Sequence, residues 1–535
     1  MLKFSKQSQI EMGDKWIVLG LLFLSLTLWL VGLGNLPLRD WDEGTYGIVA
    51  REIYRTGNWF YPTLQGSPFL LKPPLMQWLI AICYHLGGVG EFTTRFPGAF
   101  LTALGVPLIY LIGRLVFLKT PPALFSSLVY LTLLPVVRHG RLAMLDGMAI
   151  SFFLMLLFCI LKARDNKRYA IGIGVCLGLV TLTKGMLVMV FVLISATFVI
   201  ANKQLELLRN PYFWIGIFLG NFPALGWYIA QWQHYGDTFL KVHFEDQAFD
   251  RLGTAVEGNT GPVWYYLLEI IKYGFPWLLF FPGGLYLSWK NRQTPWGSLV
   301  FIGTVIYFTI VSLMSTKLPW YIMPIYPFLA LAVGVNLGYI WEEHSLGKFL
   351  KTPLTIKFLI GFFIFLSVAG VGGCIYFSLF DRQVPLILMS VVLTISMVIT
   401  SWFISQHSRQ FIPVLFGGMY LVLTLLMISQ SWVWELNEKF PVQPVAGLIR
   451  QHIPAGRKIY TSFPDSRPSL DFYSDCQIIP ASFGDLVDKF SSHSFLLVNE
   501  EDLGKINLKN SRVLGKSQGF RLIAPTSPSS PTNKL

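Results

Sequence analysis

The sequence predicts a polytopic α-helical membrane protein, and three features of its composition lead to that fold class. Of the 535 residues, 53% are hydrophobic and only 13% are charged, whereas an average soluble protein is about one quarter charged. Uncharged stretches such as 16–34, 358–380 and 410–430 reach the roughly 20 residues that cross a bilayer as a helix. These apolar runs are continuous rather than alternating, which argues against a membrane β-barrel. A soluble enzyme, a fibrous protein and a disordered chain are excluded.

Long apolar runs predict thirteen membrane-spanning helices. They are 16–34, 96–117, 121–137, 147–163, 169–183, 185–201, 211–233, 263–288, 296–315, 321–341, 357–378, 385–405 and 410–430. The first run is long and has no small-residue cleavage site at its end, so we expect an uncleaved span rather than a signal peptide. The apolar stretch 75–86 is too short to cross a bilayer and is expected to be re-entrant or interfacial.

The net charge of +13 is distributed unevenly between the two predicted sides of the membrane. With a cytoplasmic N-terminus, the cytoplasmic segments contain 17 basic and 6 acidic residues, while the opposite loops up to residue 430 contain 12 of each. Basic residues favour the cytoplasmic side, so this orientation is predicted, in the plasma (inner) membrane. The basic excess is therefore a topology signal, and we expect membrane lipids rather than nucleic acid as partners.

The composition of the chain changes at about residue 430. Residues 1–430 are predicted to form a transmembrane module with two long outer loops, 35–95 and 234–262. Residues 431–524 are predicted to form a small α/β domain outside the membrane, and the Ser/Pro/Thr-rich tail 525–535 is predicted to be disordered. Within the small domain the expected strands are 458–463, 494–499 and 519–523, and the expected helices are 444–452 and 483–490.

The first outer loop combines an acidic turn with a lysine beside two prolines. Asp40, Asp42 and Glu43 precede a predicted interfacial helix at about 43–56, which Asp42 or Asp40 is placed to cap. Lys72 follows in the segment Leu71-Lys72-Pro73-Pro74. Chemistry on lipid phosphates needs a cation for the phosphate and a carboxylate for an acceptor hydroxyl or a metal. The alternative is that the acidic residues form only a cap and a solvated turn.

Further charged residues fall at predicted outer ends of spans. Lys184 lies within an almost uncharged stretch, where a cation is a functional candidate by default; its alternative is snorkelling to the surface. Lys317, which precedes Tyr321, has a similar position. Asp146 follows Arg138 and Arg141 at the start of a span, where capping that helix is its alternative role.

The second long outer loop contains a candidate site for a divalent metal. His243, Glu245 and Asp246 offer an imidazole and carboxylates, although their spacing is irregular. No other cofactor is predicted, because the five cysteines are scattered and form no CxxC pattern.

The ordered set of these motifs resembles the GT-C superfamily of polyprenyl-phosphate-sugar-dependent glycosyltransferases. The similarity is to bacterial aminoarabinose transferases of lipid A and to the related dolichyl-phosphate-mannose protein mannosyltransferases. The resemblance runs from about 36 to 330, and the topology extends it to about 430. The blocks that carry it are Asp42-Glu43-x-x-Tyr46, Gly57-Asn58-Trp59, Lys72-Pro73, Arg95, the block around Asp146, Thr183-Lys184-Gly185 and Lys317-Leu318-Pro319-x-Tyr321.

The resemblance implies an inverting transfer of a sugar from a polyprenyl-phosphate carrier to a lipid, glycan or protein acceptor at the outer face. Asp42 and Glu43 would be the catalytic residues, and Asp42 would match the family's first-loop acidic residue. The donor phosphate would be bound by Lys72, Lys184, Lys317 and Tyr321. The same cavity would be lined by Asp40, Tyr46, Arg138, Arg141 and Asp146.

Three positions depart from the aminoarabinose transferase pattern. That pattern has Arg at the position of Thr45 and Glu at that of Leu71, and its second-loop His is replaced near Asp246, with His243 close by. Lipid A specificity and a shared metal site are therefore not implied by the resemblance.

Two other classes of function compete with the transferase. A transporter or lipid flippase predicts charges at the bilayer midplane and often a duplicated architecture, whereas this chain gathers its polar residues in outer loops and shows no internal repeat. An assembly subunit with a partner-binding outer domain leaves Asp42 and Lys72 without a role.

Overall fold

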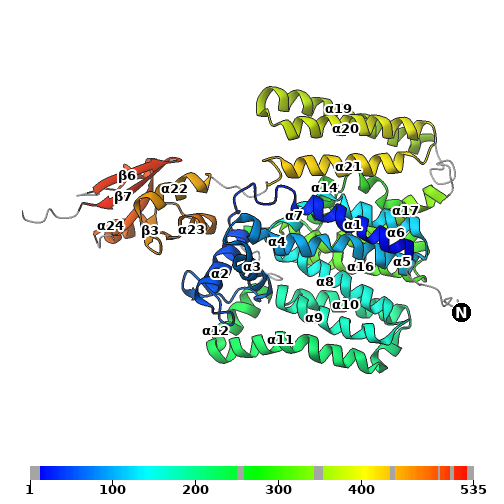
Figure 1. Ribbon diagram of the computed structural model, residues 1–535, viewed down its shortest axis with the longest axis horizontal. Helices are drawn as coiled ribbons and strands as arrows, with labels where there is room; N and C mark the ends of the chain where they lie inside the picture. Colours follow the sequence, from blue (N-terminus) through cyan, green and yellow to red (C-terminus); the bar gives the residue numbers. More distant parts are fainter. Residues whose placement is uncertain are drawn as a thin grey trace, which may run out of the picture. The chain divides into compact units, whose positions relative to one another are not determined.

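The computed structural model describes residues 12–249, 258–342, 353–433, 440–491, 494–506 and 511–526. These residues divide into two compact units (Figure 1). The helical unit contains the described residues within 1–35, 70–76 and 95–433, and the loop–sheet unit contains those within 36–69, 77–94 and 434–535. The observed boundary at 433 lies beside the predicted one at 430. The first outer loop, predicted as part of the transmembrane module, instead groups mostly with the C-terminal segment.

The helical unit consists of helices joined by short turns. Its α-helices are α1 (Met12–Leu30), α4 (Glu91–Ala103, of which 91–94 belong to the other unit), α5 (Gly105–Phe117), α6 (Thr120–Leu131), α7 (Leu134–Arg141), α8 (Leu145–Lys162), α9 (Ala170–Lys184), α10 (Leu187–Ala201), α11 (Pro211–Tyr235), α12 (Asp237–Leu240), α14 (Tyr265–Tyr273), α15 (Phe281–Lys290), α16 (Pro295–Leu313), α17 (Tyr326–Glu342), α19 (Pro353–Tyr376), α20 (Val384–Ser405) and α21 (Phe411–Ile428). The shorter 3₁₀ or π segments are η1 (Lys167–Tyr169), η2 (Leu205–Arg209), η3 (Lys241–Phe249), η5 (Trp277–Leu279), η6 (Pro319–Ile325) and η7 (Phe377–Asp381).

Within the described residues, nine helical segments are long and apolar enough to cross a membrane, or ten when the bent pair α6–α7 is one span. Every predicted span contains helix, but four do not form one long helix. Span 121–137 divides into α6 and α7, which are bent by 54°. Spans 169–183 and 185–201 correspond to α9 and α10, of 15 residues each. Span 263–288 divides into α14, η5 and α15 around Pro276, because proline interrupts a helix. The count of thirteen crossings stays a prediction.

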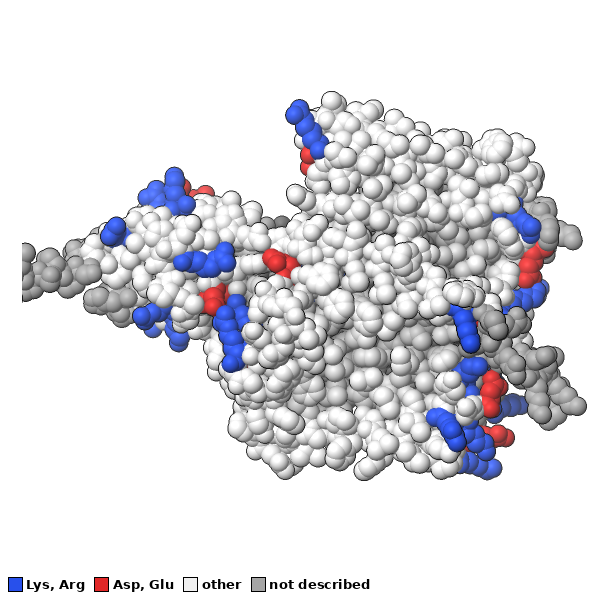
Figure 2. Space-filling model, in the orientation of Figure 1, with Lys and Arg blue, Asp and Glu red and all other residues white. Residues whose placement is uncertain are grey.

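Charged side chains are unevenly distributed over the helical unit. Figure 2 shows a broad face of this unit that is almost free of Lys, Arg, Asp and Glu, with the charges gathered at the ends of the helices. A surface of this kind suits a hydrocarbon environment, because a charge at membrane depth is costly. The arrangement supports a multi-pass membrane protein.

Glycines bring α9 and α11 into close contact. Gly174 and Gly178 of α9 meet Gly216 and Gly220 of α11, and a Cβ on Gly178 would lie 1.8 Å from the Gly220 carbonyl oxygen. Two facing small-xxx-small patterns allow such an approach between membrane helices. Figure 1 shows the two helices side by side. This packing fixes α9, whose last residue is Lys184.

The loop–sheet unit joins the first loop to a C-terminal α/β segment. Its first-loop elements are α2 (Asp42–Thr56), the antiparallel pair β1 (Thr63–Leu64) and β2 (Ser67–Pro68), and most of α3 (Leu75–Gly87). Its C-terminal elements are α22 (Val442–His452), β3 (Lys458–Thr461), α23 (Pro468–Ser474), β4 (Gln477–Pro480), α24 (Phe483–Ser491), β5 (Phe495–Asn499), α25 (Glu500–Leu503), β6 (Ser511–Ser517) and β7 (Phe520–Pro525).

The five strands form one mixed sheet in the order β4-β3-β5-β7-β6. Strand β3 is parallel to β4 and β5, while β7 is antiparallel to β5 and β6. Side chains alternate between the faces of a strand: Leu497 packs in the core with α22 and α23, whereas Leu496 and Val498 pack with α24. Strands and helices therefore form at all the predicted positions. Residues 527–535, predicted as a disordered tail, lie outside the described residues.

Candidate active site

Lys184 and Asp146 form a partly buried ion pair in the helical unit. Lys184 ends α9, and its Nζ lies 2.5 Å from Oδ1 of Asp146, in the first turn of α8. The two side chains are 20% and 6% exposed. The lysine Nζ also lies 5.2 Å from the centre of the Tyr321 ring, within the range of a cation–π interaction. The structure thus brings together three predicted residues from three separate segments.

Gly185 places this ion pair beside the Lys72-Pro73 segment. The residue has a φ of 43°, a conformation that favours glycine. A Cβ at this position would lie 3.1 Å from the Tyr228 hydroxyl, 3.6 Å from His243 Nε2 and 3.8 Å from Pro73 Cγ. Two predicted blocks, Lys72-Pro73 and Thr183-Lys184-Gly185, therefore converge at one place in the unit.

His243 is the buried centre of this convergence. Its Nδ1 lies 3.1 Å from the Leu70 carbonyl oxygen, and its Nε2 lies 3.0 Å from the Tyr228 hydroxyl. Because a carbonyl can only accept, Nδ1 donates, and Nε2 of the neutral ring accepts from tyrosine. Burial lowers the pKa of His243 to about 4, and the nearby charge of Lys72 acts in the same direction. The imidazole therefore holds the backbone just before Lys72.

The candidate metal ligands do not come together in the described structure. Both ring nitrogens of His243 already have hydrogen-bond partners, Glu245 is exposed, and the side chain of Asp246 lies outside the described residues. The described residues contain no cluster of three or more His, Cys, Asp or Glu side chains suited to a metal. As arranged, His243 does not fit a metal-ligand role, and we derive no step through a metal.

Lys317 is hydrogen-bonded to the end of a helix. Its Nζ donates to the carbonyl oxygens of Ser312 at 2.7 Å and Val311 at 3.3 Å, and it lies 5.3 Å from the Tyr266 ring centre. Burial lowers the pKa of this amine. These contacts place Lys317 at the C-terminus of α16, and its contact with the donor phosphate stays a prediction.

Arg138 and Arg141 donate hydrogen bonds to backbone carbonyls near helix ends. Both are buried, and Arg141 donates to the carbonyl oxygens of Leu28, Trp29 and Val31 at the end of α1. Arg138 donates to the carbonyl of Trp432 at 3.2 Å. The two guanidinium groups therefore satisfy backbone carbonyls in the last turn of α1 and after α1 and α21, and their cavity-lining role stays a prediction.

The acidic turn belongs to the loop–sheet unit. Asp42 is half-buried and begins α2, whose N-cap residue is Trp41 without a side-chain cap bond. The N-cap position is therefore occupied by Trp41 rather than by Asp40 or Asp42 as expected. Glu43 is buried and accepts a hydrogen bond from the Arg39 N–H at 3.0 Å, so its carboxylate shapes the turn.

Two other predicted residues of this loop are buried in the same unit. Asp40 accepts hydrogen bonds from Arg467 and Ser469, and Tyr46 is 2% exposed. The sequence also missed Tyr228, which has no distinguishing pattern among 22 tyrosines, most of them in or beside apolar segments.

Comparisons with known proteins find similarity to glycosyltransferases. A family described as dolichyl-phosphate-mannose-protein mannosyltransferase matches residues 71–227. An undecaprenyl phosphate-α-4-amino-4-deoxy-L-arabinose arabinosyl transferase of Pseudomonas fluorescens is 28% identical over 333 residues, which cover 61% of this chain and 60% of the relative. The chain thus matches less than two thirds of that relative's length.

Two solved structures share the fold. ArnT from Cupriavidus metallidurans bound to undecaprenyl phosphate has a TM-score of 0.76 at 19% identity, covering 96% of this chain and 99% of that one. An oligosaccharyltransferase from Archaeoglobus fulgidus has a TM-score of 0.53 at 12% identity, covering 89% and 66%. The predicted resemblance to GT-C glycosyltransferases is therefore confirmed, and the fold is that of a polytopic helical membrane protein.

Proposed function

We propose that this chain is a membrane glycosyltransferase that takes a sugar from a polyprenyl-phosphate donor. The observation that carries the proposal is the convergence of Lys184, its partner Asp146 and the Lys72-Pro73 segment in the helical unit. Cations held at fixed positions near the membrane surface stabilise a phosphate more strongly than mobile ones do in water. The similarity to arabinosyl transferases and to ArnT supports the same donor class.

The proposed reaction is a single displacement at the anomeric carbon of the sugar. The bond between this carbon and the donor phosphate oxygen breaks as a bond to the acceptor oxygen forms, which inverts the configuration. Lys72 and Lys184 stabilise the negative charge on the departing polyprenyl phosphate. Asp42 accepts the proton of an acceptor hydroxyl; when the acceptor is itself a phosphate no base is needed, and Asp42 orients it.

The acceptor is proposed only as a class, namely a lipid, a glycan or a protein. The location in the inner membrane, the cytoplasmic N-terminus and the outer position of the C-terminal segment also belong to the proposal, and they rest on the charge asymmetry of the loops. The transporter alternative is not favoured, since the similar proteins are transferases by name.

The test uses purified full-length protein, radiolabelled polyprenyl-phosphate sugars and a membrane extract as the acceptor source. Free polyprenyl phosphate is measured for the wild type and for Asp42→Asn, Lys72→Ala and Lys119→Ala. Lys119 is the matched control, because its exposed ion pair with Glu342 lies on the predicted cytoplasmic side. We expect release by the wild type and by Lys119→Ala, and a loss of at least about tenfold in the two site variants.

Two results would count against the proposal in different ways. A folded wild type that releases nothing from any donor would favour a transporter. Release that survives both site substitutions would keep the enzyme but discard the assigned residues.

A further inference from the structure

The C-terminal segment binds the acidic turn through the buried carboxylate of Asp40. Arg467 Nε pairs with Oδ2 of Asp40, and both the backbone N–H and the hydroxyl of Ser469 donate to Oδ1. The guanidinium of Arg467 is itself fixed, because it donates to the Phe440 carbonyl at 2.8 Å and lies 4.1 Å from that residue's ring centre. Asp40 is therefore held by a rigid group two residues before Asp42.

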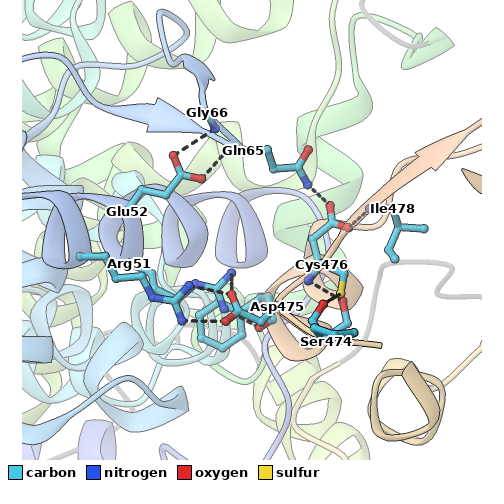
Figure 3. Close-up of polar contacts among 12 residues, drawn as sticks. Arg51, Glu52, Gln65, Gly66, Ser474, Asp475, Cys476 and Ile478 are labelled. Atoms are coloured by element: carbon cyan, nitrogen blue, oxygen red, sulfur yellow. Dashed lines mark hydrogen bonds and ion pairs between the residues drawn. The ribbon is translucent and has the colours of Figure 1, made fainter. Parts of the chain in front are cut away.

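A second set of contacts holds the other end of α2. Arg55 donates two hydrogen bonds to Asp475, at 2.8 and 2.9 Å. Arg51 lies 3.3 Å from the same carboxylate and donates to the Phe472 carbonyl at 2.7 Å. Figure 3 shows Arg51 beside Asp475. The Arg55 hydrogen bonds lower the pKa of Asp475, so this carboxylate stays charged and paired at neutral pH.

Glycines on α2 allow this close packing against α23. A Cβ on Gly44 would lie 2.7 Å from the backbone nitrogen of Ser469 and 2.8 Å from the Pro468 carbonyl carbon. One turn later, a Cβ on Gly47 would lie 3.2 Å from the Phe472 ring. The face of α2 that carries these glycines is thus shaped to receive residues 467–475, which we name the C-terminal clamp.

The backbone between the clamped Asp40 and Asp42 is strained. Trp41 has φ 65° and ψ −117° and is 51% exposed, so a bulky residue adopts a conformation that glycine normally occupies. Such strain persists only where the surrounding contacts over-determine it. The bonds from Arg467 and Ser469 to Asp40 supply that constraint on one side, and the rigid helix α2 supplies it on the other.

We propose that the C-terminal clamp positions the carboxylate of Asp42 for the transfer reaction, with Arg467, Ser469 and Asp475 as positioning residues. This inference rests on the proposed function of Asp42. The clamp touches neither donor nor acceptor; it acts through Asp40 and α2. A misplacement of a reacting group by about 1 Å costs roughly a hundredfold in rate. The residues proposed to bind the donor phosphate, Lys72 and Lys184, belong to the other unit.

The decisive variants are Arg467→Ala, Arg467→Lys and the matched control Arg521→Ala. Arg521 pairs with Glu500 at 3.2 Å within the same C-terminal segment. For full-length protein and the donor that the wild type uses, we expect Arg467→Ala to lower kcat about ten- to hundredfold with the donor KM within twofold. Arg467→Lys should recover part of kcat because it restores the charge, and Arg521→Ala should match the wild type.

Asp475→Asn provides a milder test, because its side chain is 28% exposed and the asparagine oxygen can still accept a hydrogen bond from Arg55. We expect a smaller fall in kcat, about three- to tenfold, with an unchanged thermal unfolding midpoint within a few degrees. This variant keeps the proposal testable if Arg467→Ala does not fold.

The outcomes separate the two proposals. A wild-type kcat in both Arg467→Ala and Asp475→Asn, while Asp42→Asn is inactive, would overturn the clamp but leave the transferase intact. A rise in donor KM equal to the fall in kcat, or an equal loss in Arg521→Ala, would also overturn it, since either indicates general destabilisation. If Asp42→Asn retains full activity, the proposed role of Asp42 fails first.

Discussion

At the residue scale, Lys184 shows how burial and pairing define what a side chain does. The sequence predicted a functional lysine from its position in an uncharged stretch, and the structure adds a carboxylate partner that the sequence did not specify. Burial removes the hydration of each charge, which costs free energy. Burying two opposite charges as a pair costs less free energy than burying either one without its partner. The position near the helix N-terminus also stabilises the negative charge of Asp146.

The pair predicts a separation of stability from activity. Lys184→Ala leaves the Asp146 carboxylate buried and unpaired, and breaking a buried pair costs about 3–5 kcal/mol. We expect a lower unfolding midpoint together with a loss of donor turnover. The double variant Lys184→Ala with Asp146→Ala should regain most of the stability but no activity. Recovery of turnover in the double variant would show that Lys184 has no role toward the phosphate.

Asp471 in α23 is a buried carboxylate whose ionisation opposes folding. It accepts hydrogen bonds from the Ile478 N–H and from the Gln65 amide. Burial raises its pKa to about 7, although these hydrogen bonds and Arg51 act in the opposite direction; Asp40 adds to the rise. The folded protein therefore keeps this proton to a higher pH than the unfolded chain does.

This shift predicts a stability that falls as the pH rises from about 4 to about 7. In that window the unfolded chain loses the proton before the folded one, at a cost on the order of 4 kcal/mol at most. Hydrogen exchange in β3 and β4 of the full-length protein, corrected for intrinsic rates, measures the change. Asp471→Asn should remove this pH dependence, while the exposed control Asp485→Asn should keep it; an unchanged profile in Asp471→Asn would refute the assignment.

Several polar residues have contact partners that could not be predicted from the sequence. The family resemblance implies that Asp40, Arg138 and Arg141 line the cavity and that Lys317 binds the donor phosphate. The structure gives them contacts with backbone carbonyls or with Arg467. A sequence shows where a charged residue lies along the chain. Which carbonyl or carboxylate pairs with it depends on the packing of segments that are distant in sequence.

At the element scale, the contact between α9 and α11 depends on glycine. Gly178→Ala would place a methyl group 1.8 Å from the Gly220 carbonyl oxygen, so the helices must separate. We expect a destabilisation of roughly 1–3 kcal/mol or more and a loss of turnover, because Lys184 ends α9. Thermal unfolding in detergent measures the first effect.

Gly226→Ala in α11 is the matched control, since a Cβ there meets nothing within 4 Å. The thermal unfolding midpoint of this variant should equal or exceed that of the wild type, because alanine has a higher helix propensity than glycine. Equal effects of the two substitutions would exclude close helix packing as the cause.

The elements that sequence reasoning missed share a physical cause. Strand β4 is four residues long, and β6 carries Arg512 and Lys516 on an edge of the sheet. Short or charged edge strands lack the continuous apolar run that indicates a strand. Helix α23 has only seven residues and is stabilised by its contact with α2, which no local pattern reveals.

At the scale of the whole molecule, the charge asymmetry predicts which ends face the cytoplasm. In a cysteine-free background, Lys516→Cys on β6 and Gln406→Cys after α20 provide two exposed labelling positions. We expect a membrane-impermeant thiol reagent to label Lys516→Cys in intact cells and to label Gln406→Cys only after the membrane is opened. The reverse pattern would invert the proposed topology.

The division into two units is the largest feature that the sequence did not predict. Composition indicated the boundary near 430, because hydropathy changes there. It gave no sign that residues 36–69 join the C-terminal segment, since the partners Asp40 and Arg467 are 427 positions apart. Pairing over such a distance is specified by complementary surfaces rather than by local pattern.

That separation along the chain has a consequence for biosynthesis. The acidic turn leaves the ribosome among the first fifty residues, whereas Arg467 and Asp475 follow more than 400 residues later. In the first loop, Asp40 and Arg51 therefore cannot form these contacts until nearly all of the polypeptide has been made. A nascent chain that stops before Arg467 still contains every predicted span but cannot complete this turn. The acidic turn therefore reaches its final structure only at the end of translation.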